Sequence, residues 1–140
     1  MMRLFHIGKD GGPYSTVTGY WLIELKRLFS IALLKFENGS RDEYHSHAFN
    51  SISWVLSGRL EERLHEDPYK VPKFYLPSFR PILTKRTTFH RVESEGTTWV
   101  FTLRGPWAKQ WAEYNPFKGK YAVLSHGRRV VEEFERLVWQ

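Results

Sequence analysis

Two histidines separated by one residue, His45 and His47, are the pair whose type and spacing best fit a chemical role. Side chains two positions apart in a β-strand point to the same face, so both imidazoles can converge on one point. A third histidine, His90, lies in a later strand-like segment and would complete a metal site. Imidazole ligands with open positions suit Fe(II), Zn(II), Cu(II), Ni(II) or Mn(II). We therefore expect a divalent metal ion at His45, His47 and His90, without being able to assign the element.

Polar residues near these histidines are candidates for binding a substrate. If the strand around His90 is regular, Arg86 and Thr88 share its face. A guanidinium there would clamp a carboxylate or phosphate through two hydrogen bonds, and the alternative is a surface ion pair. Arg104, at the end of the next strand, is a second candidate. The expected ligand is therefore a small molecule, with an anionic one suggested by Arg86.

These residues need strands to position them, and short runs of β-branched and aromatic residues between turn signals predict an all-β domain. We expect strands at residues 16–25, 29–36, 41–47, 51–56, 59–65, 83–93, 97–104 and 121–124. Residues 1–15 are interpreted as a polar lead-in, and residues 107–120 as irregular. Residues 66–81 contain four prolines, which remove ladder donors, so a loop or an edge segment is expected there.

The end of the chain has helical spacing. Ser125 is a candidate N-cap, and the residues after it form one apolar stripe, which consists of Val130, Val131, Phe134, Leu137 and Val138. We expect a short C-terminal helix over residues 126–139, packed on a barrel of residues 16–124. The 140 residues are expected to form a single domain.

Composition narrows the classes of function. The chain has no cysteine, which excludes disulfides, thiolate ligands and a cysteine nucleophile, and fits a reducing cytoplasm. No apolar run approaches the ~20 residues that span a membrane, and no signal peptide is recognised. The net charge of +6 permits nucleic-acid binding, but the basic residues are dispersed, so nucleic acid is not the expected partner.

The stretch from Gly39 to Gly58 resembles the first motif of the cupin superfamily. That motif places a glycine five residues before a His-x-His pair and a second glycine further on, as here. His90 fits the later histidine of the second cupin motif, although the usual Pro-x-Gly before it is missing. The resemblance covers residues 16–104. It implies a double-stranded β-helix of the jelly-roll kind, often with a metal in the barrel mouth.

The sequence departs from this family at one ligand. Common cupins have a glutamate at the position of Ser51, and Ser51 and Ser53 share its phase, which implies that both face the pocket. Asn50 or Glu61 are weaker candidates for an oxygen ligand. Three-histidine cupins such as the thiol dioxygenases hold Fe(II) with open positions for substrate and dioxygen. The resemblance thus implies oxygenase chemistry first, and metal-assisted isomerisation or hydrolysis next.

Two further alternatives stay open. The missing glutamate also fits a cupin without metal, whose histidines bind a ligand by hydrogen bonds. The segments HSHAFNSISWVLSGRLEE, FHRV and WVFTLRGPW are similar to small cupin-like proteins of phage and bacterial genomes, mostly of unknown function. The resemblance implies no substrate. Cupins often pair through their sheets, so a homodimer is also expected.

Overall fold

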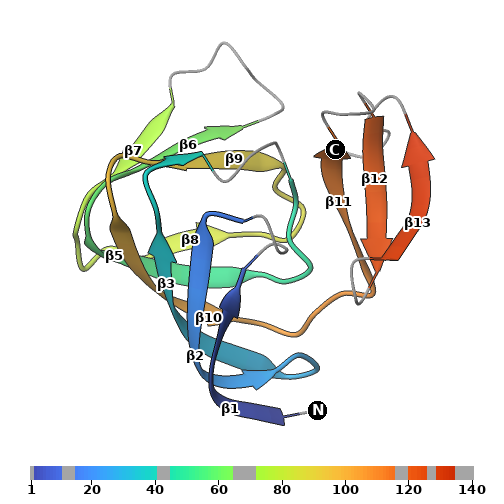
Figure 1. The fold of residues 1–140 in the computed structure, drawn as a ribbon, viewed down its shortest axis with the longest axis horizontal. Coiled ribbons are helices and arrows are strands. Elements are labelled where there is room, and N and C mark those ends of the chain that lie inside the picture. Colours follow the sequence, from blue (N-terminus) through green and yellow to red (C-terminus); the bar gives the residue numbers. More distant parts are fainter. Residues whose placement is uncertain are drawn as a thin grey trace.

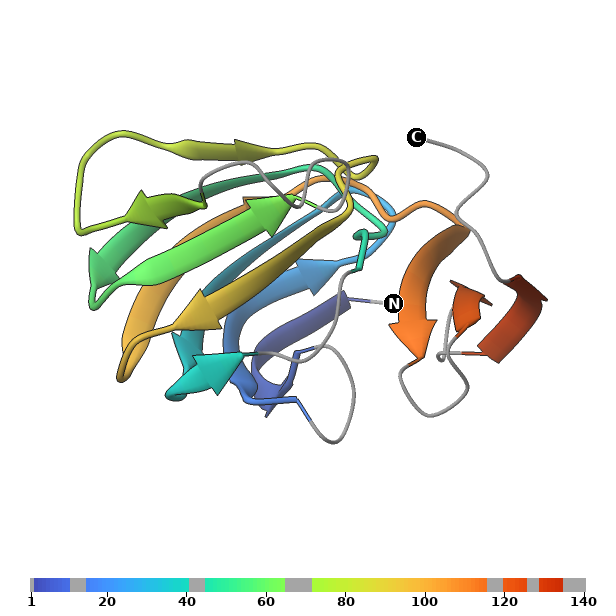
Figure 2. The same cartoon turned by 90° about the horizontal axis from the view of Figure 1, so that it is seen from above.

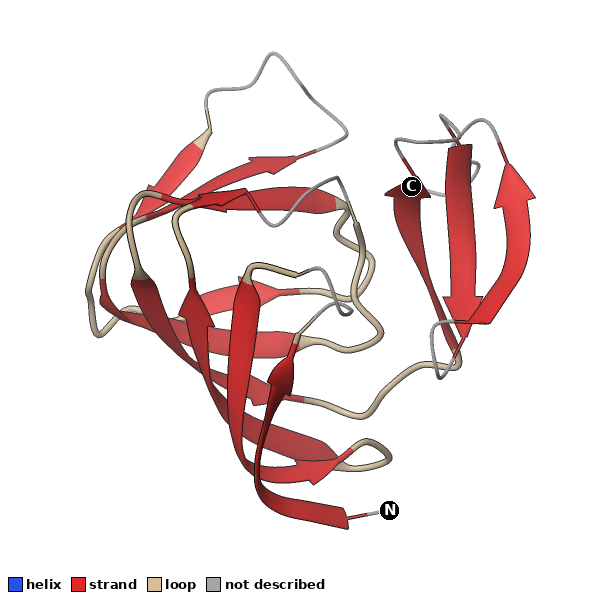
Figure 3. Cartoon of the chain, viewed as in Figure 1, coloured by secondary structure: helices blue, strands red, loops and turns tan. Residues whose placement is uncertain are grey.

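The structure is a computed structural model that describes residues 2–10, 15–40, 45–64, 72–115, 120–125 and 129–134. In these residues all regular elements are strands, and neighbouring strands pair antiparallel (Figure 3). They form sheets of six, four and three strands (Figure 1). The described residues include no helix long and apolar enough to cross a membrane.

The largest sheet supplies one wall of the core. Its strand order is β1-β2-β3-β10-β5-β8. Its members are β1 (Met2–Lys9), β2 (Val17–Leu25), β3 (Phe29–Phe36), β10 (Thr98–Arg104), β5 (Ser51–Ser57) and β8 (Ile82–Thr84). Buried residues alternate with half-buried ones along β10, so its inward face carries Thr98, Val100, Thr102 and Arg104. This period of two directs polar as well as apolar side chains to the interior.

The second sheet supplies the opposite wall. Its order is β4-β9-β6-β7, from β4 (Gly39–Ser40), β9 (His90–Ser94), β6 (Leu60–Leu64) and β7 (Lys73–Tyr75). Figures 1 and 2 show this sheet facing the larger one. One apolar cluster joins them: Trp21, Leu34 and Val100 from the larger sheet pack in the same cluster as Leu60 and Val92 from the smaller. Burial of these side chains holds the two sheets together.

The third sheet stands to one side of this pair in both views. It consists of β11 (Gln110–Asn115), β12 (Lys120–Ser125) and β13 (Arg129–Phe134). Trp111 and Leu124 from this sheet pack with Ala48 and Phe49, which follow the histidine pair in the chain. The third sheet therefore anchors the segment that carries the histidines.

One glycine of the histidine motif has a clear structural reason. Gly58 lies in the turn between β5 and β6, where the chain passes from the first sheet to the second, and its φ is 93°. A Cβ at this position would collide with Thr97 and Thr98. Only glycine combines that backbone conformation with so close an approach.

Several expectations about the elements were wrong. Residues 1–15 include strand β1, which pairs with β2, and residues 107–120 include β11. The segment 83–93 is not one strand. The Thr88 N–H donates to the Lys85 carbonyl in a turn, so β8 joins the six-stranded sheet and β9 the four-stranded one. The face shared by Arg86, Thr88 and His90 was inferred from a regular strand that does not exist.

The expected C-terminal helix was also wrong. Residues 129–134 form β13, which pairs with β12, and residues 126–128 and 135–140 lie outside the described part of the chain. Consecutive β-branched residues, Val130 and Val131, favour a strand, and Val130 is in register with Leu124 of β12. No closed barrel is found either. Within the described residues, the two facing sheets keep separate edges, β1 and β8 on one and β4 and β7 on the other.

Candidate metal centre

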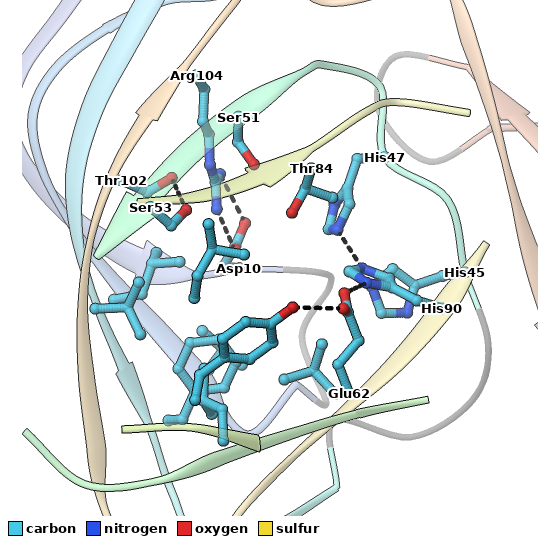
Figure 4. A pocket seen from close by; sticks show the side chains of 18 of the residues that line it. Asp10, His45, His47, Ser51, Ser53, Glu62, Thr84, His90, Thr102 and Arg104 are labelled. Carbon is cyan, nitrogen blue, oxygen red and sulfur yellow. Dashed lines mark hydrogen bonds and ion pairs between the residues drawn. The ribbon is translucent and has the colours of Figure 1, made fainter. Parts of the chain in front are cut away.

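A cavity of about 90 Å³ lies between the two facing sheets (Figure 4). Most of its wall is apolar and comes from the core residues between the sheets, among them Val17, Leu34 and Val100. Polar side chains gather at two places on this wall. We call them the histidine pole, formed by His45, His47, His90 and Glu62 together with Tyr75, which is hydrogen-bonded to Glu62, and the arginine pole, formed by Arg104, Asp10, Ser53 and Thr102.

The backbone of His45 positions the first imidazole. His45 and His90 exchange both backbone hydrogen bonds, each 2.9 Å long. The next residue, Ser46, donates its N–H to the carbonyl of Ala112 on β11 at 3.0 Å, and its hydroxyl accepts from the Ala112 N–H at 3.0 Å. His45 thereby joins the four-stranded sheet to the three-stranded one. The segment is fixed on both sides although it is not a regular strand.

The three histidines converge as expected. One ligand atom from each of His45, His47 and His90 lies within 4.8 Å of the other two. Their ring centroids are 4.9–5.0 Å apart. His45 and His90 are buried, and His47 is half-buried. These three are the only group of this kind in the part of the chain that the structure describes.

Glu62, on β6, fixes the orientation of one imidazole. Nδ1 of His90 lies 2.6 Å from Oε2 of Glu62 and donates to it, because an ionised carboxylate can only accept. The hydroxyl of Tyr75 donates to the other oxygen, Oε1, at 3.1 Å. With its proton on Nδ1, neutral His90 presents the Nε2 lone pair to the other histidines. A carboxylate behind a ligand histidine is the usual second shell of a metal site.

The protonation states fit this arrangement. Burial alone would raise the pKa of Glu62, but hydrogen bonds from His90 and Tyr75, together with the charge of Lys73, hold that pKa below its usual value. Burial first, and then the Glu62 carboxylate, raise the pKa of Tyr75. Glu62 therefore stays ionised and Tyr75 stays a hydrogen-bond donor at neutral pH.

The donor set fits a divalent ion. Nε2 of His47 and Nε2 of His90 lie 2.9 Å apart. Two imidazole nitrogens that each lie about 2.1 Å from one ion are separated by about 3.0 Å at the right angle of an octahedral site and by about 3.4 Å at the tetrahedral angle that zinc prefers. Three neutral nitrogens with an apolar wall behind them are the ligand type that Zn(II) and Fe(II) accept. His45, His47 and His90 would hold the ion, and the remaining positions would face the cavity.

The arginine pole contains a buried ion pair. Arg104 donates from Nη1 and Nη2 to Oδ1 and Oδ2 of Asp10, at 3.1 and 2.7 Å. The guanidinium lies 4.5 Å from the centre of the Phe49 ring, on which it makes a cation–π contact. The hydroxyls of Ser53 and Thr102 lie 2.9 Å apart beside this pair. This pole is charged but already neutralised.

The structure brings some of the expected substrate-binding residues to the cavity and not others. Ser51, Ser53 and Arg104 line it. Arg86 and Thr88 do not, because the turn at 85–88 interrupts the strand that would have aligned them with His90. Arg86 lines an outer cleft of about 340 Å³ instead, on the other side of His47.

The two weaker oxygen candidates do not line the cavity. Oδ1 of Asn50 accepts from the Arg86 N–H at 2.8 Å, and Glu61 pairs with Arg63 at 2.8 Å. The inward carboxylate is Glu62, one position further along. Glu62 shares the face of Leu60, so the alternation of side chains in β6 could have predicted that Glu62 points inward.

Asp10 and Tyr75 were missed for other reasons. Asp10 follows the unexpected strand β1, and nothing local marks its partner 94 positions away. Tyr75 lies in the proline-rich segment, where β7 is an edge strand, as one of the two interpretations of that segment allowed. Contacts with residues far away in the chain place Asp10 and Tyr75 at the cavity, and one sequence alone does not reveal such contacts.

No family model matches the sequence, and no curated protein is similar to it at a significant level. Solved structures do resemble the fold. An RmlC-like cupin from Shewanella frigidimarina superposes with a TM-score of 0.54 at 16% identity, covering 73% of this chain and 84% of that one. The polyketide cyclase RemF from Streptomyces resistomycificus gives 0.58 at 19% identity, covering 73% of each chain.

A third similar structure is described as a sugar phosphate isomerase from a cupin superfamily, from Silicibacter pomeroyi. It superposes with a TM-score of 0.57 at 10% identity, covering 91% of this chain and 84% of that one. Identities this low show the fold and not the activity. Together with the facing sheets and the three converging histidines, they show that this chain has the cupin fold.

Proposed function

We propose that the protein is a metal-binding cupin in which His45, His47 and His90 hold one divalent ion and the cavity beside them holds a small organic molecule. The observation that carries the proposal is the convergence of three imidazoles, one of them locked in the required tautomer by Glu62. Three protein ligands leave coordination positions open for a substrate.

The chemistry of the site follows from its neutral ligands. When bound, a divalent ion supplies Lewis acidity and, if it is iron, the capacity to react with dioxygen. Glu62 keeps the proton of His90 on Nδ1, so that Nε2 stays available. The apolar wall lowers the local dielectric constant and so strengthens electrostatic contacts inside the cavity.

Oxygenase chemistry of the Fe(II) type, on a small anionic molecule, is the activity that we propose to test first. Three neutral histidines leave the full positive charge of the ion in the site. The ion and Arg104 then outweigh the carboxylates of Glu62 and Asp10, which favours an anionic ligand. Isomerisation or hydrolysis by Lewis-acid polarisation would use the same geometry.

The decisive test is the metal content of the protein purified without chelator or affinity metal. We expect near-stoichiometric iron, zinc, nickel or manganese in the wild type, and its loss in the His45→Ala/His47→Ala variant. His6→Asn is the matched control, because His6 stacks on Trp21 and pairs with Glu24, outside the triad. A wild type that remains metal-free after reconstitution, or a double variant that keeps its metal, would refute the proposal.

A ligand-binding cupin without metal is the alternative. It is favoured by the 2.9 Å contact between Nε2 of His47 and Nε2 of His90, which can be a hydrogen bond if His47 carries its proton on Nε2. In that case chelators leave ligand affinity unchanged, and the histidine variants lose ligand without any change in metal content. The metal proposal requires the opposite in both measurements.

We also propose a homodimer. Strand β1 is an edge of the six-stranded sheet, and four large apolar side chains on it are more than half exposed: Met2, Leu4, Phe5 and Ile7. An apolar edge strand is a template for pairing with another chain. Light scattering should give the mass of two chains, and Leu4→Lys should shift it to one. A monomeric wild type would contradict this proposal.

A further inference from the structure

The arginine pole is an unusual place for a fully neutralised ion pair, since it faces the same cavity as the proposed metal ion. Among the described residues, Arg104 is the only arginine or lysine that lines this cavity. Its side chain is 4% exposed, whereas that of its partner Asp10 is 23% exposed. The cation is fixed in the wall, and the anion is the more accessible member.

Several contacts hold the guanidinium in place without Asp10. Its carbon atom lies over the rings of Phe49, at 4.5 Å, and Trp21, at 6.0 Å. Arg104 is the last residue of β10, in register with Ser51 on one side and Ser30 on the other. The guanidinium therefore has contacts at the cavity wall that do not depend on its carboxylate partner.

The hydrogen bonding of the arginine is incomplete. Nε of Arg104 is buried and has no hydrogen-bond partner among the described residues. Asp10 uses only the two terminal nitrogens. A buried donor without a partner is costly, so this pole has unused capacity for a polar ligand.

Asp10 offers Arg104 the same group that a ligand would offer. Two parallel N–H···O bonds join a guanidinium to a carboxylate, which is the geometry by which arginine recognises small organic acids. Asp10 follows β1, and its N–H donates to the Val17 carbonyl at 2.9 Å, which holds its backbone at the cavity. Its side chain thus occupies the position of a ligand carboxylate.

We propose that Arg104 is the carboxylate-binding residue of the cavity and that Asp10 is a built-in competitor, which a ligand carboxylate replaces. The ligand is a short organic acid with an apolar middle and a second polar group. This inference rests on the proposed function in one respect: the second polar group lies at the ion on the histidine pole. A cavity of about 90 Å³ has room for roughly six to nine water-sized groups.

The test compares succinate, which has a carboxylate at each end, with the neutral succinamide, by calorimetry on the metal-loaded protein. Removing the competitor and removing the binding residue should act in opposite directions. Asp10→Asn should bind succinate roughly tenfold more tightly or better, and Arg104→Gln at least as much more weakly, with little change for succinamide. Arg86→Gln, in the outer cleft, is the control and should bind as the wild type does.

A pair with a purely structural role gives a different pattern. Both variants would then shift succinate affinity in the same direction, or neither would shift it, and either result would overturn the proposal. Metal content is measured on the same samples. If the protein holds no metal but the two variants still change succinate affinity in opposite directions, only the metal proposal fails. If the metal content is normal but the two variants do not change succinate affinity in opposite directions, only the proposed carboxylate site fails.

A second measurement covers the case in which Asp10→Asn does not fold. The Nε–H signal of Arg104 is assigned in the nitrogen-15 spectrum of the wild type by its disappearance in Arg104→Gln. Succinate should shift this signal in a saturable way, and succinamide should not. An unshifted signal at saturating succinate, or an equal shift by both compounds, would show that the carboxylate does not reach Arg104.

Discussion

The two poles of the cavity share one apolar wall but differ in how their polar groups are paired. At the histidine pole, three imidazole rings converge, and Glu62, which also accepts from Tyr75, accepts from Nδ1 of His90. At the arginine pole, a full charge is present, and Asp10 neutralises it within the chain. The first pole presents imidazole nitrogens to the cavity, and the second presents an ion pair.

This difference suits the histidine pole to binding a metal ion and the arginine pole to binding an exchangeable anionic ligand. Converging imidazole nitrogens have strong affinity for a cation from outside. A guanidinium with an internal carboxylate binds an outside anion only by exchange, so its affinity is set by a competition. One pole should therefore respond to mutation mainly in metal content, and the other mainly in stability and ligand affinity.

The largest expected effect distinguishes the poles by metal content. His90→Ala removes one ligand and should reduce bound metal to background, whereas Arg104→Gln should keep the wild-type amount, because Arg104 is no part of the donor set. Elemental analysis of both variants after the same purification measures this. Equal metal content in the two variants would contradict the assignment of metal binding to the histidine pole.

The next effect concerns stability at the arginine pole. Asp10→Asn leaves the buried guanidinium of Arg104 without its carboxylate, which should cost about 3–5 kcal/mol in the free energy of unfolding. Urea unfolding of metal-free protein measures it. Ser53→Ala, which removes only the neutral hydroxyl contact with Thr102, should cost about 1 kcal/mol. A similar small cost for both variants would mean that the ion pair is effectively solvated.

A smaller effect tests the carboxylate behind His90. Glu62→Gln should weaken metal affinity about 10- to 100-fold, because the ring loses the charged acceptor that orients it. Competition with a chelator of known affinity measures the change. Glu61→Gln is the control, since Glu61 pairs with Arg63 instead. Equal losses in both variants would argue against an orienting role for Glu62.

The smallest effect is a pH dependence at Tyr75. Its pKa is raised above the usual 10.0, so the folded state keeps a proton that the unfolded state releases. The stabilisation is fully present below pH 10.0 and should decline as the pH rises above that value. Unfolding curves of the wild type and Tyr75→Phe should therefore converge at alkaline pH. A difference that stays constant from neutral to alkaline pH would contradict the assignment.

The sequence could predict what short-range pattern controls. The alternation of side chains in β10 is a local property, and it predicted a strand with one face in the core. The spacing of His45 and His47 is also local, and it predicted that the two imidazoles converge. Gly58 is recognisable in the same way, because a turn with positive φ favours glycine.

Long-range pairing controlled what could not be predicted. The sequence of β1 was interpreted as a polar lead-in, but in the structure β1 pairs with β2. The sequence of β13 has helical spacing, but in the structure β13 pairs with β12. The single strand expected at 83–93 divides because its halves belong to different sheets. Arg86 was misplaced as a direct result, and Asp10 was missed, since each depends on a partner far away in the chain.

X-ray absorption of the metal-loaded protein shows directly whether His45, His47 and His90 bind the ion. We expect about three imidazole ligands at roughly 2.0–2.1 Å from the ion, and two in His90→Ala reconstituted with excess metal. A wild-type spectrum dominated by oxygen ligands, with no imidazole scattering and no change in the variant, would contradict this expectation. The ion would then lie elsewhere, and the three histidines would serve the cavity only by hydrogen bonds.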